Sequence, residues 1–275
     1  ETKINNNNEN KKENSIMKKK SSIALPLMLI IGLSLLLYPT VSNYWNSLHQ
    51  SKAIAGYRET VSILDEQKYD DIWSDALNYN QSINRLTVSE LTDAQRQDYY
   101  SQLDVTETGI MGYIEIPDIN CTLPIYHGTS DSVLQVAVGH LEASSLPVGG
   151  EGSHCILSGH RGLPSAKLFT NLDQLKEGDV FFLSVLDEQL TYQVDQISIV
   201  DPQDISQLTF EDGKDYCTLV TCTPYGVNSH RLLVRGHRVP NESVIVKRVT
   251  ADATEIQRFW TTLAVCLPVF LPGTF

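Results

Sequence analysis

The chain has 275 residues, of which 41% are hydrophobic and 20% are charged, and its formal net charge is -12. Once its polar beginning and its two apolar segments are set aside, roughly 200 residues remain, enough for one domain with its own hydrophobic core. No cluster of Lys and Arg accompanies aromatic residues in the middle of the chain. Because phosphate binding needs a basic surface, the composition argues against a nucleic-acid partner.

The first part of the chain divides into a polar and an apolar segment. Residues 1–22 are mainly Asn, Glu and Lys, so we expect a disordered, basic, cytoplasmic N-terminus. Residues 23–44 carry no charge and are long enough to anchor the chain across a bilayer. A cleaved signal peptide is the alternative, but no small-residue cleavage site follows, and Tyr44 and Trp45 suit a membrane interface. The lysines before the anchor predict that the rest of the chain lies outside the cell.

A second apolar segment lies at the other end. Residues 259–275 carry no charge, and about 17 residues is the lower limit for a helix that spans a bilayer. We expect a second transmembrane segment, truncated where the sequence stops, with an interfacial or buried helix as the alternative. Residues 241–258 are then a linker.

Residues 45–106 predict a helical region before the main domain. Apolar residues recur at mixed three- and four-residue steps over residues 45–80, a spacing typical of an amphipathic helix. A shorter helix is expected over residues 89–103, with Asp93 as its candidate N-cap.

Residues 107–240 predict a mainly β domain. Short runs of β-branched and aromatic residues alternate with Gly, Asp, Asn and Pro, which favours a sandwich or barrel over a parallel α/β sheet. One helix is expected within this domain, over residues 165–175. The predicted strands lie near residues 112–117, 121–126, 154–158, 180–185, 190–200, 217–222 and 231–239.

Five cysteines are an odd number, so an exported chain keeps at least one thiol unpaired. They are Cys121, Cys155, Cys217, Cys222 and Cys266. None has the Cys-x-x-Cys spacing, so a zinc site has little support. An unpaired thiol outside the cell raises the question of a reactive nucleophile.

Cys222 and His160 stand where two apolar strands are expected to end. Each precedes a loop rich in Pro and Gly, where a side chain is accessible to a substrate. An imidazolium beside a thiol stabilises the reactive thiolate. A core-filling cysteine and a structural histidine are the alternatives. The pairing also requires the two strands to be neighbours, which the sequence does not show.

Arg231 opens the next expected strand, nine residues after Cys222. If the loop between them folds back, the guanidinium lies beside the thiol, where it could stabilise an oxyanion or orient a carbonyl. A solvated arginine at the edge of the domain is the alternative.

Five stretches of the sequence resemble the sortase family, and especially its class C branch, which polymerises pilins in Gram-positive bacteria. They are residues 114–119, 123–128, 139–150, 158–170 and 218–236. The last of them reads TLVTCTPYGVNSHRLLVRG and contains Cys222 and Arg231, while residues 158–170 read SGHRGLPSAKLFT and contain His160. The similarity runs from about residue 109 to 240, nearly half of the chain.

The resemblance implies a fold and a catalytic set. The fold is a closed eight-stranded β-barrel with N-terminal helices and flanking transmembrane segments. Cys222 is then the nucleophile, His160 its acid/base partner, and Arg231 the cation that stabilises the oxyanion or the substrate. No metal or organic cofactor is needed.

The resemblance also implies a reaction and its partners. The thiol would cleave an LPxTG-like sorting signal between Thr and Gly and hold the pilin as a thioacyl enzyme. A lysine amine of the next pilin subunit would then resolve this intermediate at the cell membrane. A housekeeping sortase that attaches proteins to the cell wall is an alternative, and a non-catalytic pilus-assembly module is a second one.

The sequence departs from the class C pattern at one point. These enzymes usually carry a lid before the barrel, with an Asp-Pro-aromatic motif whose ring covers the thiol. The nearest tripeptide here is Asp71-Ile-Trp73, which lacks the proline whose fixed φ would make a lid loop rigid. We expect Trp73 to pack a helix against the barrel, and a lid formed by Asp71 and Trp73 is the alternative.

Two other cysteines precede the candidate catalytic pair at equal distances. Cys155 lies five residues before His160, and Cys217 lies five residues before Cys222. If the two strands are parallel neighbours, Cys155 and Cys217 lie side by side. Two reduced thiols in the core are then expected rather than a disulfide, because the side chains of neighbouring strands rarely converge as a disulfide requires.

Overall fold

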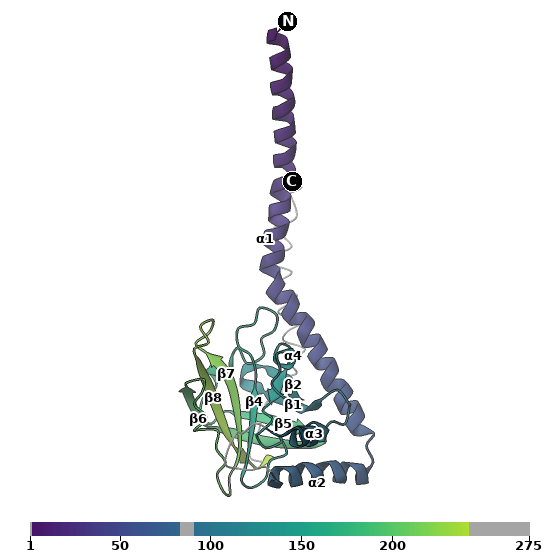
Figure 1. Ribbon diagram of the computed structural model, residues 1–275, viewed down its shortest axis with the longest axis vertical. Coiled ribbons are helices and arrows are strands. Elements are labelled where there is room, and N and C mark those ends of the chain that lie inside the picture. The colour runs from purple at the N-terminus through teal and green to yellow at the C-terminus, as the bar shows by residue number, and fades with distance from the viewer. Residues whose placement is uncertain (1, 83–90, 242–275) are drawn as a thin grey trace, which may run out of the picture.

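The computed structural model describes residues 2–82 and 91–241, with side chains from Pro26 onward (Figure 1). The expected second transmembrane segment over residues 259–275 lies outside the described residues. The same holds for the linker after Asn241.

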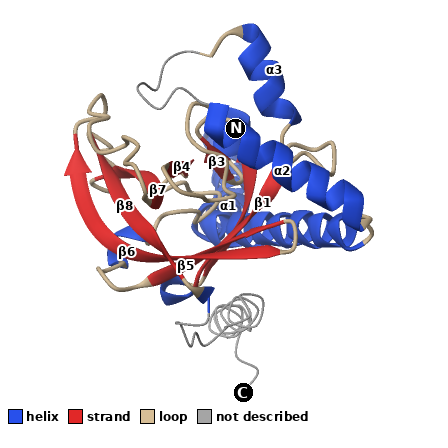
Figure 2. Cartoon of the chain, turned by 90° about the horizontal axis from the view of Figure 1, so that it is seen from below, coloured by secondary structure: helices blue, strands red, loops and turns tan. Residues whose placement is uncertain are grey.

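Eight strands close into a barrel in the order β1-β2-β3-β4-β7-β8-β6-β5 (Figure 2). They are β1 (Ile110–Ile116), β2 (Cys121–His127), β3 (Val138–His140), β4 (Ser153–Ser158), β5 (Val180–Val185), β6 (Glu188–Val200), β7 (Asp215–Thr223) and β8 (His230–Val239). Neighbours are antiparallel except β2 with β3 and β4 with β7. Fully buried residues such as Ile114, Leu183 and Leu219 form the core. The expected closed eight-stranded barrel is therefore confirmed.

The strand directions define two ends of the barrel. We call the end at which β4 and β7 finish and β8 begins the upper rim, marked by Ser158, Thr223 and His230. We call the opposite end, where β4 and β7 begin, the lower rim, marked by Ser153 and Asp215. Strand β6 also begins at the lower rim, because its first residues pair with the end of β8.

Three helices precede the barrel. They are α1 (Thr2–Ser62), α2 (Glu66–Ser82) and α3 (Asp93–Ser101). The single helix expected over residues 45–80 is thus divided in two. The division follows from Asp65, whose carboxylate accepts a hydrogen bond from the amide of Lys68 (2.8 Å), as a residue that caps a new helix does.

Two of these helices begin differently from expectation. Helix α1 includes the polar segment from Thr2 onward, where disorder was expected over residues 1–22. Extending an existing helix costs less than nucleating a new one, so the polar segment continues the apolar helix that follows it. Helix α3 is capped by Thr92 instead of Asp93, because Thr92 and Gln95 form a reciprocal capping box.

The helix expected over residues 165–175 is also not observed. Only one short 3-10 turn, η2 (Leu172–Gln174), forms there. Leu168 has a φ of 40°, which is incompatible with a right-handed helix. The segment instead forms an irregular loop above the end of β4.

Tyr57 joins the last turns of α1 to the barrel. Its hydroxyl donates to the carbonyl of Met111 (3.0 Å) and accepts from the amide of Leu186 (2.7 Å). The residue is 1% exposed, and burial raises the pKa of its phenol well above the usual value. Because Met111 lies at the start of β1 and Leu186 follows β5, this neutral hydroxyl bridges two strands at the lower rim.

Helices α2 and α3 are held by buried polar side chains. The side chain of Asn80 on α2 bonds both the carbonyl and the amide of Leu146 (3.2 and 2.7 Å), in the loop before β4. On α3, the Tyr99 hydroxyl lies 2.9 Å from Nδ1 of His140 and accepts from the amide of Gly128 (2.9 Å). These contacts attach both helices to the barrel through groups that water cannot reach.

Cys155 and Cys217 lie side by side, as the sequence predicted. Cys155 and Cys217 are register partners in the parallel β4–β7 pair, and both are buried free thiols. This confirms the inference that the two strands are parallel and in this register.

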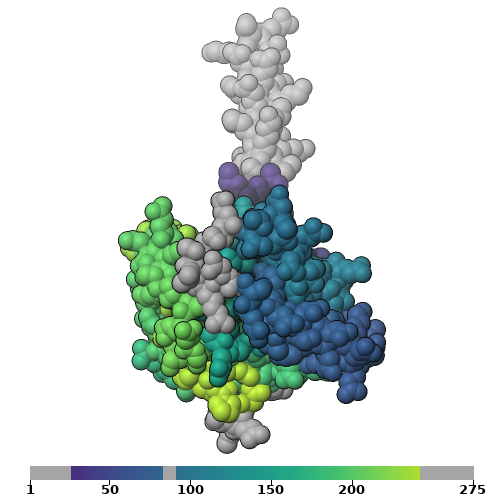
Figure 3. Space-filling model, turned by 60° about the horizontal axis from the view of Figure 1, so that its bottom comes forward, coloured from purple at the N-terminus to yellow at the C-terminus, as the bar shows by residue number. Residues whose placement is uncertain are grey.

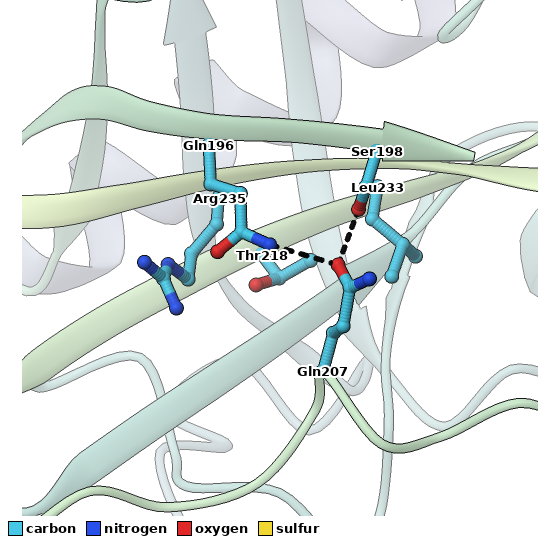
Figure 4. A pocket seen from close by; sticks show the side chains of 6 residues that line it. All are labelled: Gln196, Ser198, Gln207, Thr218, Leu233 and Arg235. Atoms are coloured by element: carbon cyan, nitrogen blue, oxygen red, sulfur yellow. Dashed lines mark hydrogen bonds between the residues drawn. The ribbon is translucent and has the colours of Figure 1, made fainter. Parts of the chain in front are cut away.

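The connection from β6 to β7, residues 201–214, lies on the outer surface of the barrel. Figure 4 shows Gln207 from this connection directed at Gln196 and Ser198 on β6, and its side-chain oxygen accepts a hydrogen bond from each. Close by, Nδ1 of His154 donates to the carbonyl of Thr209 (2.8 Å), and Nε2 lies 2.7 Å from the hydroxyl of Thr218. His154, which lies on β4, therefore links the β6–β7 connection to β7.

The buried position of His154 predicts a pH-dependent stability. Burial lowers the pKa of its imidazole in the folded protein. Below about pH 6.5 the unfolded chain takes up a proton that the folded chain resists. The free energy of unfolding should therefore fall as the pH decreases below that value, and denaturant titrations between pH 8 and pH 5 measure it.

His154→Gln serves as the control for this effect. Glutamine can donate and accept like neutral histidine but does not titrate, so the variant should lose stability less steeply on acidification. Identical pH slopes for the two proteins would contradict the assignment to His154.

Candidate active site

Cys222 lies at the upper rim, at the end of β7, and differs from the other described cysteines. Cys121, Cys155 and Cys217 are buried, whereas Cys222 is partly exposed. Burial raises the pKa of Cys121 to about 12, so that thiol stays protonated and inert. Among the cysteines that the structure describes, Cys222 is the one that a substrate can reach.

Arg231 is the cross-strand partner of Cys222. The two residues are directly opposite in the antiparallel β7–β8 pair, so their side chains point to the same face. The Arg231 guanidinium donates to the carbonyls of Asn228 (3.4 Å) and His230 (3.1 Å), which hold it over the β7–β8 loop. The loop between Cys222 and Arg231 therefore folds back, which was the condition for Arg231 to lie near Cys222.

His160 follows β4 directly and continues its register along β7. The parallel pairing ends at Ser158 with Val220, and Gly159 extends it by donating to the Val220 carbonyl (3.0 Å) and accepting from the Thr221 hydroxyl (2.7 Å). One residue further along each strand are His160 and Cys222. Because neighbouring strands lie about 4.8 Å apart, this register brings the imidazole and the thiol to one place on the rim.

The loop that carries His160 is anchored by Phe169. The carbonyl of His160 accepts a hydrogen bond from the Phe169 amide (3.1 Å), and the Phe169 ring lies against Gly159. A Cβ at position 159 would meet that ring at 2.6 Å, so only glycine fits. The backbone on each side of the histidine is therefore fixed.

Arg161 connects the His160 loop to the end of β7, a role that the sequence alone did not suggest. Its guanidinium donates to the hydroxyl of Thr223 (3.2 Å) and forms an ion pair with Asp173. The side chain is 8% exposed. Since Arg161 adjoins His160 and Thr223 adjoins Cys222, one buried side chain ties together the segments that carry the candidate acid/base and nucleophile. One indication in the sequence that Arg161 matters was its position within residues 158–170, one of the stretches that resemble the sortase family.

Tyr225 adds a second contact between the same two segments. Its ring lies on Gly162, where an added Cβ would meet it at 3.0 Å, and Gly162 also has a φ of 77° that favours glycine. The Arg161 guanidinium lies 5.9 Å from the centre of this ring. The β7–β8 loop and the His160 loop are thus packed against each other.

The segment considered as a lid lies elsewhere. Asp71 and Trp73 are on α2, whose Asn80 contacts the loop before β4 at the lower rim, and Trp73 is half-buried against the core. Figure 3, with the bottom of the molecule turned forward, shows α2 in blue on the same face as the end of β8 in yellow. Asp71 is exposed. This position, at the opposite end of the barrel from Cys222, favours packing over a lid.

Metal binding is not indicated by the described side chains. Within the part of the chain that the structure describes, no group of three or more His, Cys, Asp or Glu side chains could hold a metal ion. The chemistry available at the upper rim is that of a thiol, an imidazole and a guanidinium on rigid strand ends.

Arg161→Gln tests whether the contact between the two loops stabilises the protein. Removing one partner of a largely buried, hydrogen-bonded ion pair typically costs about 1–3 kcal/mol. We expect a loss of this size in the free energy of unfolding, measured by denaturant titration. The matched control is Arg96→Gln, because the side chain of Arg96 is 48% exposed in its pair with Glu142 and exposed pairs contribute about 0–1 kcal/mol. Equal losses in the two variants would contradict the structural role of Arg161.

Trp73→Ala tests the placement of the candidate lid. Because Trp73 packs at the lower rim, the variant should lose stability but leave the rate of Cys222 alkylation by a small thiol reagent unchanged. The rate is measured by mass spectrometry of the peptide that contains Cys222. A marked acceleration in the folded variant would support a lid instead.

Comparison with known proteins agrees with this arrangement. The sequence model of the sortase domain matches residues 114–239. The crystal structure of sortase C1 from Streptococcus agalactiae is 56% identical, with a TM-score of 0.68, over 69% of this chain and 99% of that chain. Sortase C from Streptococcus pneumoniae is 45% identical, with a TM-score of 0.63, over 69% and 97%. Sortase D of Bacillus subtilis is 36% identical over a match that covers 48% of this chain and 66% of that relative's length. The chain therefore belongs to the sortase family of transpeptidases, within its class C branch.

Proposed function

We propose that the protein is a membrane-anchored cysteine transpeptidase that joins pilin subunits by new amide bonds. The observation that supports this proposal is the strand register at the upper rim, which brings the backbone positions of three residues next to one another. Cys222 is paired across β7–β8 with Arg231, and His160 follows the parallel strand on the other side of Cys222. Each residue type supplies one part of a thiol-based acyl transfer.

The first half-reaction cleaves the sorting signal. The Cys222 thiolate attacks the Thr carbonyl carbon of an LPxTG-like segment, and the developing oxyanion is stabilised by the Arg231 guanidinium. The C–N bond to Gly then breaks, and His160 gives a proton to the leaving Gly amine. The Thr carbonyl is left as a thioester on Cys222.

The second half-reaction joins the subunits. The neutral lysine amine of another pilin attacks the thioester carbon, and His160 accepts the proton that the amine loses. The C–S bond breaks and restores the thiolate, and the Thr carbonyl becomes part of an amide with the lysine. No oxidant, metal or organic cofactor takes part.

The related structures support a pilin substrate over a cell-wall acceptor. The structure of the pneumococcal relative is described with reference to pilin substrate specificity, and that of Clostridium perfringens sortase C, 45% identical, contains a cell-wall sorting motif. Sequence relatives named Sortase A match at lower identity, such as 26% for the Streptococcus agalactiae protein, although the structure of a Corynebacterium diphtheriae protein named Sortase A is 41% identical. The housekeeping reaction, which attaches proteins to the cell wall, is therefore the second candidate. The two reactions form different products, so identifying the product distinguishes them.

The apolar part of α1 supports the proposed location. The helix over residues 26–62 is long and apolar enough to cross a membrane by length and composition. With the lysine-rich segment before it inside the cell, the barrel lies on the outer face of the membrane.

Cys222→Ala should abolish the reaction and leave the fold intact. The full-length protein in detergent is incubated with a candidate pilin that carries both a sorting signal and an acceptor lysine, and denaturing electrophoresis detects a covalent ladder. We expect a ladder with the unmodified protein and none with Cys222→Ala. Cys155→Ala is the matched control, since it removes a buried thiol from the adjacent strand and should retain the ladder.

Two results would contradict the proposal. A ladder formed by Cys222→Ala would exclude Cys222 as the nucleophile. Transfer to a cell-wall peptide amine in place of pilin lysine would identify the housekeeping reaction.

A further inference from the structure

The direction of α1 is fixed by a series of contacts along the barrel. Near the upper rim, the side chains of Asn43 and Asn46 bond the amide of Lys167 and the carbonyl of Ser165, each at 2.8 Å, in the loop after β4. Fourteen residues after Asn43, Tyr57 bonds Leu186 at the lower rim. Helix α1 therefore descends from the upper rim to the lower rim, and its earlier residues extend beyond the upper rim (Figure 1).

Those earlier residues are the apolar part of the helix. Large apolar side chains from Leu27 to Val41 are exposed along it, and the helix qualifies as a membrane span. Val41 and Asn46 are only five residues apart, or roughly 8 Å along a helix. The bilayer surface then lies close above the loop that Asn43 and Asn46 hold, which is the loop that carries His160.

Exposed apolar side chains occur on the same side of the barrel. In the connection between Cys222 and Arg231, beyond the ends of β7 and β8, Tyr225 is 60% exposed and Val227 is 70% exposed. Trp45, at the level of the Asn46 contact, is 63% exposed on α1. An aromatic ring with a polar end, next to apolar side chains, is typical of residues that lie at a membrane interface.

We propose that the upper rim is a membrane-contact surface, on which the β7–β8 loop lies in the headgroup region of the bilayer through Tyr225 and Val227. The partner is the lipid surface itself. The open side of the catalytic centre then faces the membrane, and its peptide substrate is one held at the outer surface of the bilayer. This inference rests on the membrane insertion of α1 contained in the proposed function.

The charges at this rim set the character of the contact. Asp201 and Asp204 lie in the neighbouring β6–β7 connection and Lys167 lies in the loop after β4, all three exposed. Asp201 is near His230 (3.6 Å). Attraction to anionic headgroups needs a cluster of Lys and Arg, and a lysine accompanied by two carboxylates does not form one. The contact therefore depends on the apolar and aromatic side chains and does not require anionic lipid.

A depth-dependent quenching experiment tests the proposal on the full-length chain. Val227→Cys is introduced into a Cys222→Ala, Cys266→Ala background, labelled with a fluorophore, and reconstituted into phosphatidylcholine vesicles that contain lipid with a quencher near the headgroup. The matched control is Ile63→Cys, which is 78% exposed and follows the end of α1 at the lower rim. We expect strong quenching at position 227 and little at position 63, and no difference between them in detergent.

Two outcomes would overturn the proposal. Equal quenching at positions 227 and 63 would show that the upper rim has no preferred contact with lipid. If Val227 instead belongs to a peptide-binding groove, position 227 is not quenched, and Val227→Asp raises the KM for a soluble sorting peptide in detergent. Because the labelled protein lacks Cys222, quenching is independent of catalysis, so a failure of the pilin reaction would leave this result unaffected.

Discussion

The parallel pairing of β4 with β7 is the constraint on which the candidate catalytic centre depends. Parallel strands cannot be joined by a tight hairpin, so the chain must leave the upper rim after His160 and return at the lower rim before Cys222. Strands β5 and β6 form on that return path. Because β4 and β7 run in the same direction, residues at equal offsets reach the same rim, and His160 and Cys222 arrive there together.

The antiparallel return of β8 completes the centre from the other side. Its register places Arg231 opposite Cys222, so Cys222 lies on the strand between β8, which carries Arg231, and β4, which His160 follows. The contacts of Arg161 with Thr223 and Asp173 then fix the loops beyond the strand ends. The geometry of the site thus results from hydrogen bonds between backbones and from one buried guanidinium, before any substrate is bound.

Much of this arrangement was accessible from the sequence. Seven of the eight strands were predicted from β-branched runs and turn residues, whereas β3, with three residues, is too short to show such a pattern. The offset of Cys155 and Cys217 gave the correct parallel register. The helix expected over residues 165–175 was wrong, because periodicity did not reveal the positive φ of Leu168. The break at Asp65 was missed because a cap inside an amphipathic run interrupts no apolar pattern. The role of Arg161 depends on two partners that are distant in the sequence, and local pattern carries no information about such contacts.

The hydroxyl of Tyr57 has a consequence for where α1 can be cut without damage to the barrel. It satisfies a carbonyl of β1 and an amide after β5 from a residue on α1, and a buried backbone group left without a partner is costly. A protease that cut α1 above Asn43 would leave the barrel with its hydrogen bonds to the helix intact. A cut beyond Tyr57 would instead remove part of the barrel's own hydrogen bonding, and the released fragment would be prone to unfold. The position of a cut in α1 therefore decides whether the remaining barrel keeps its fold or loses it.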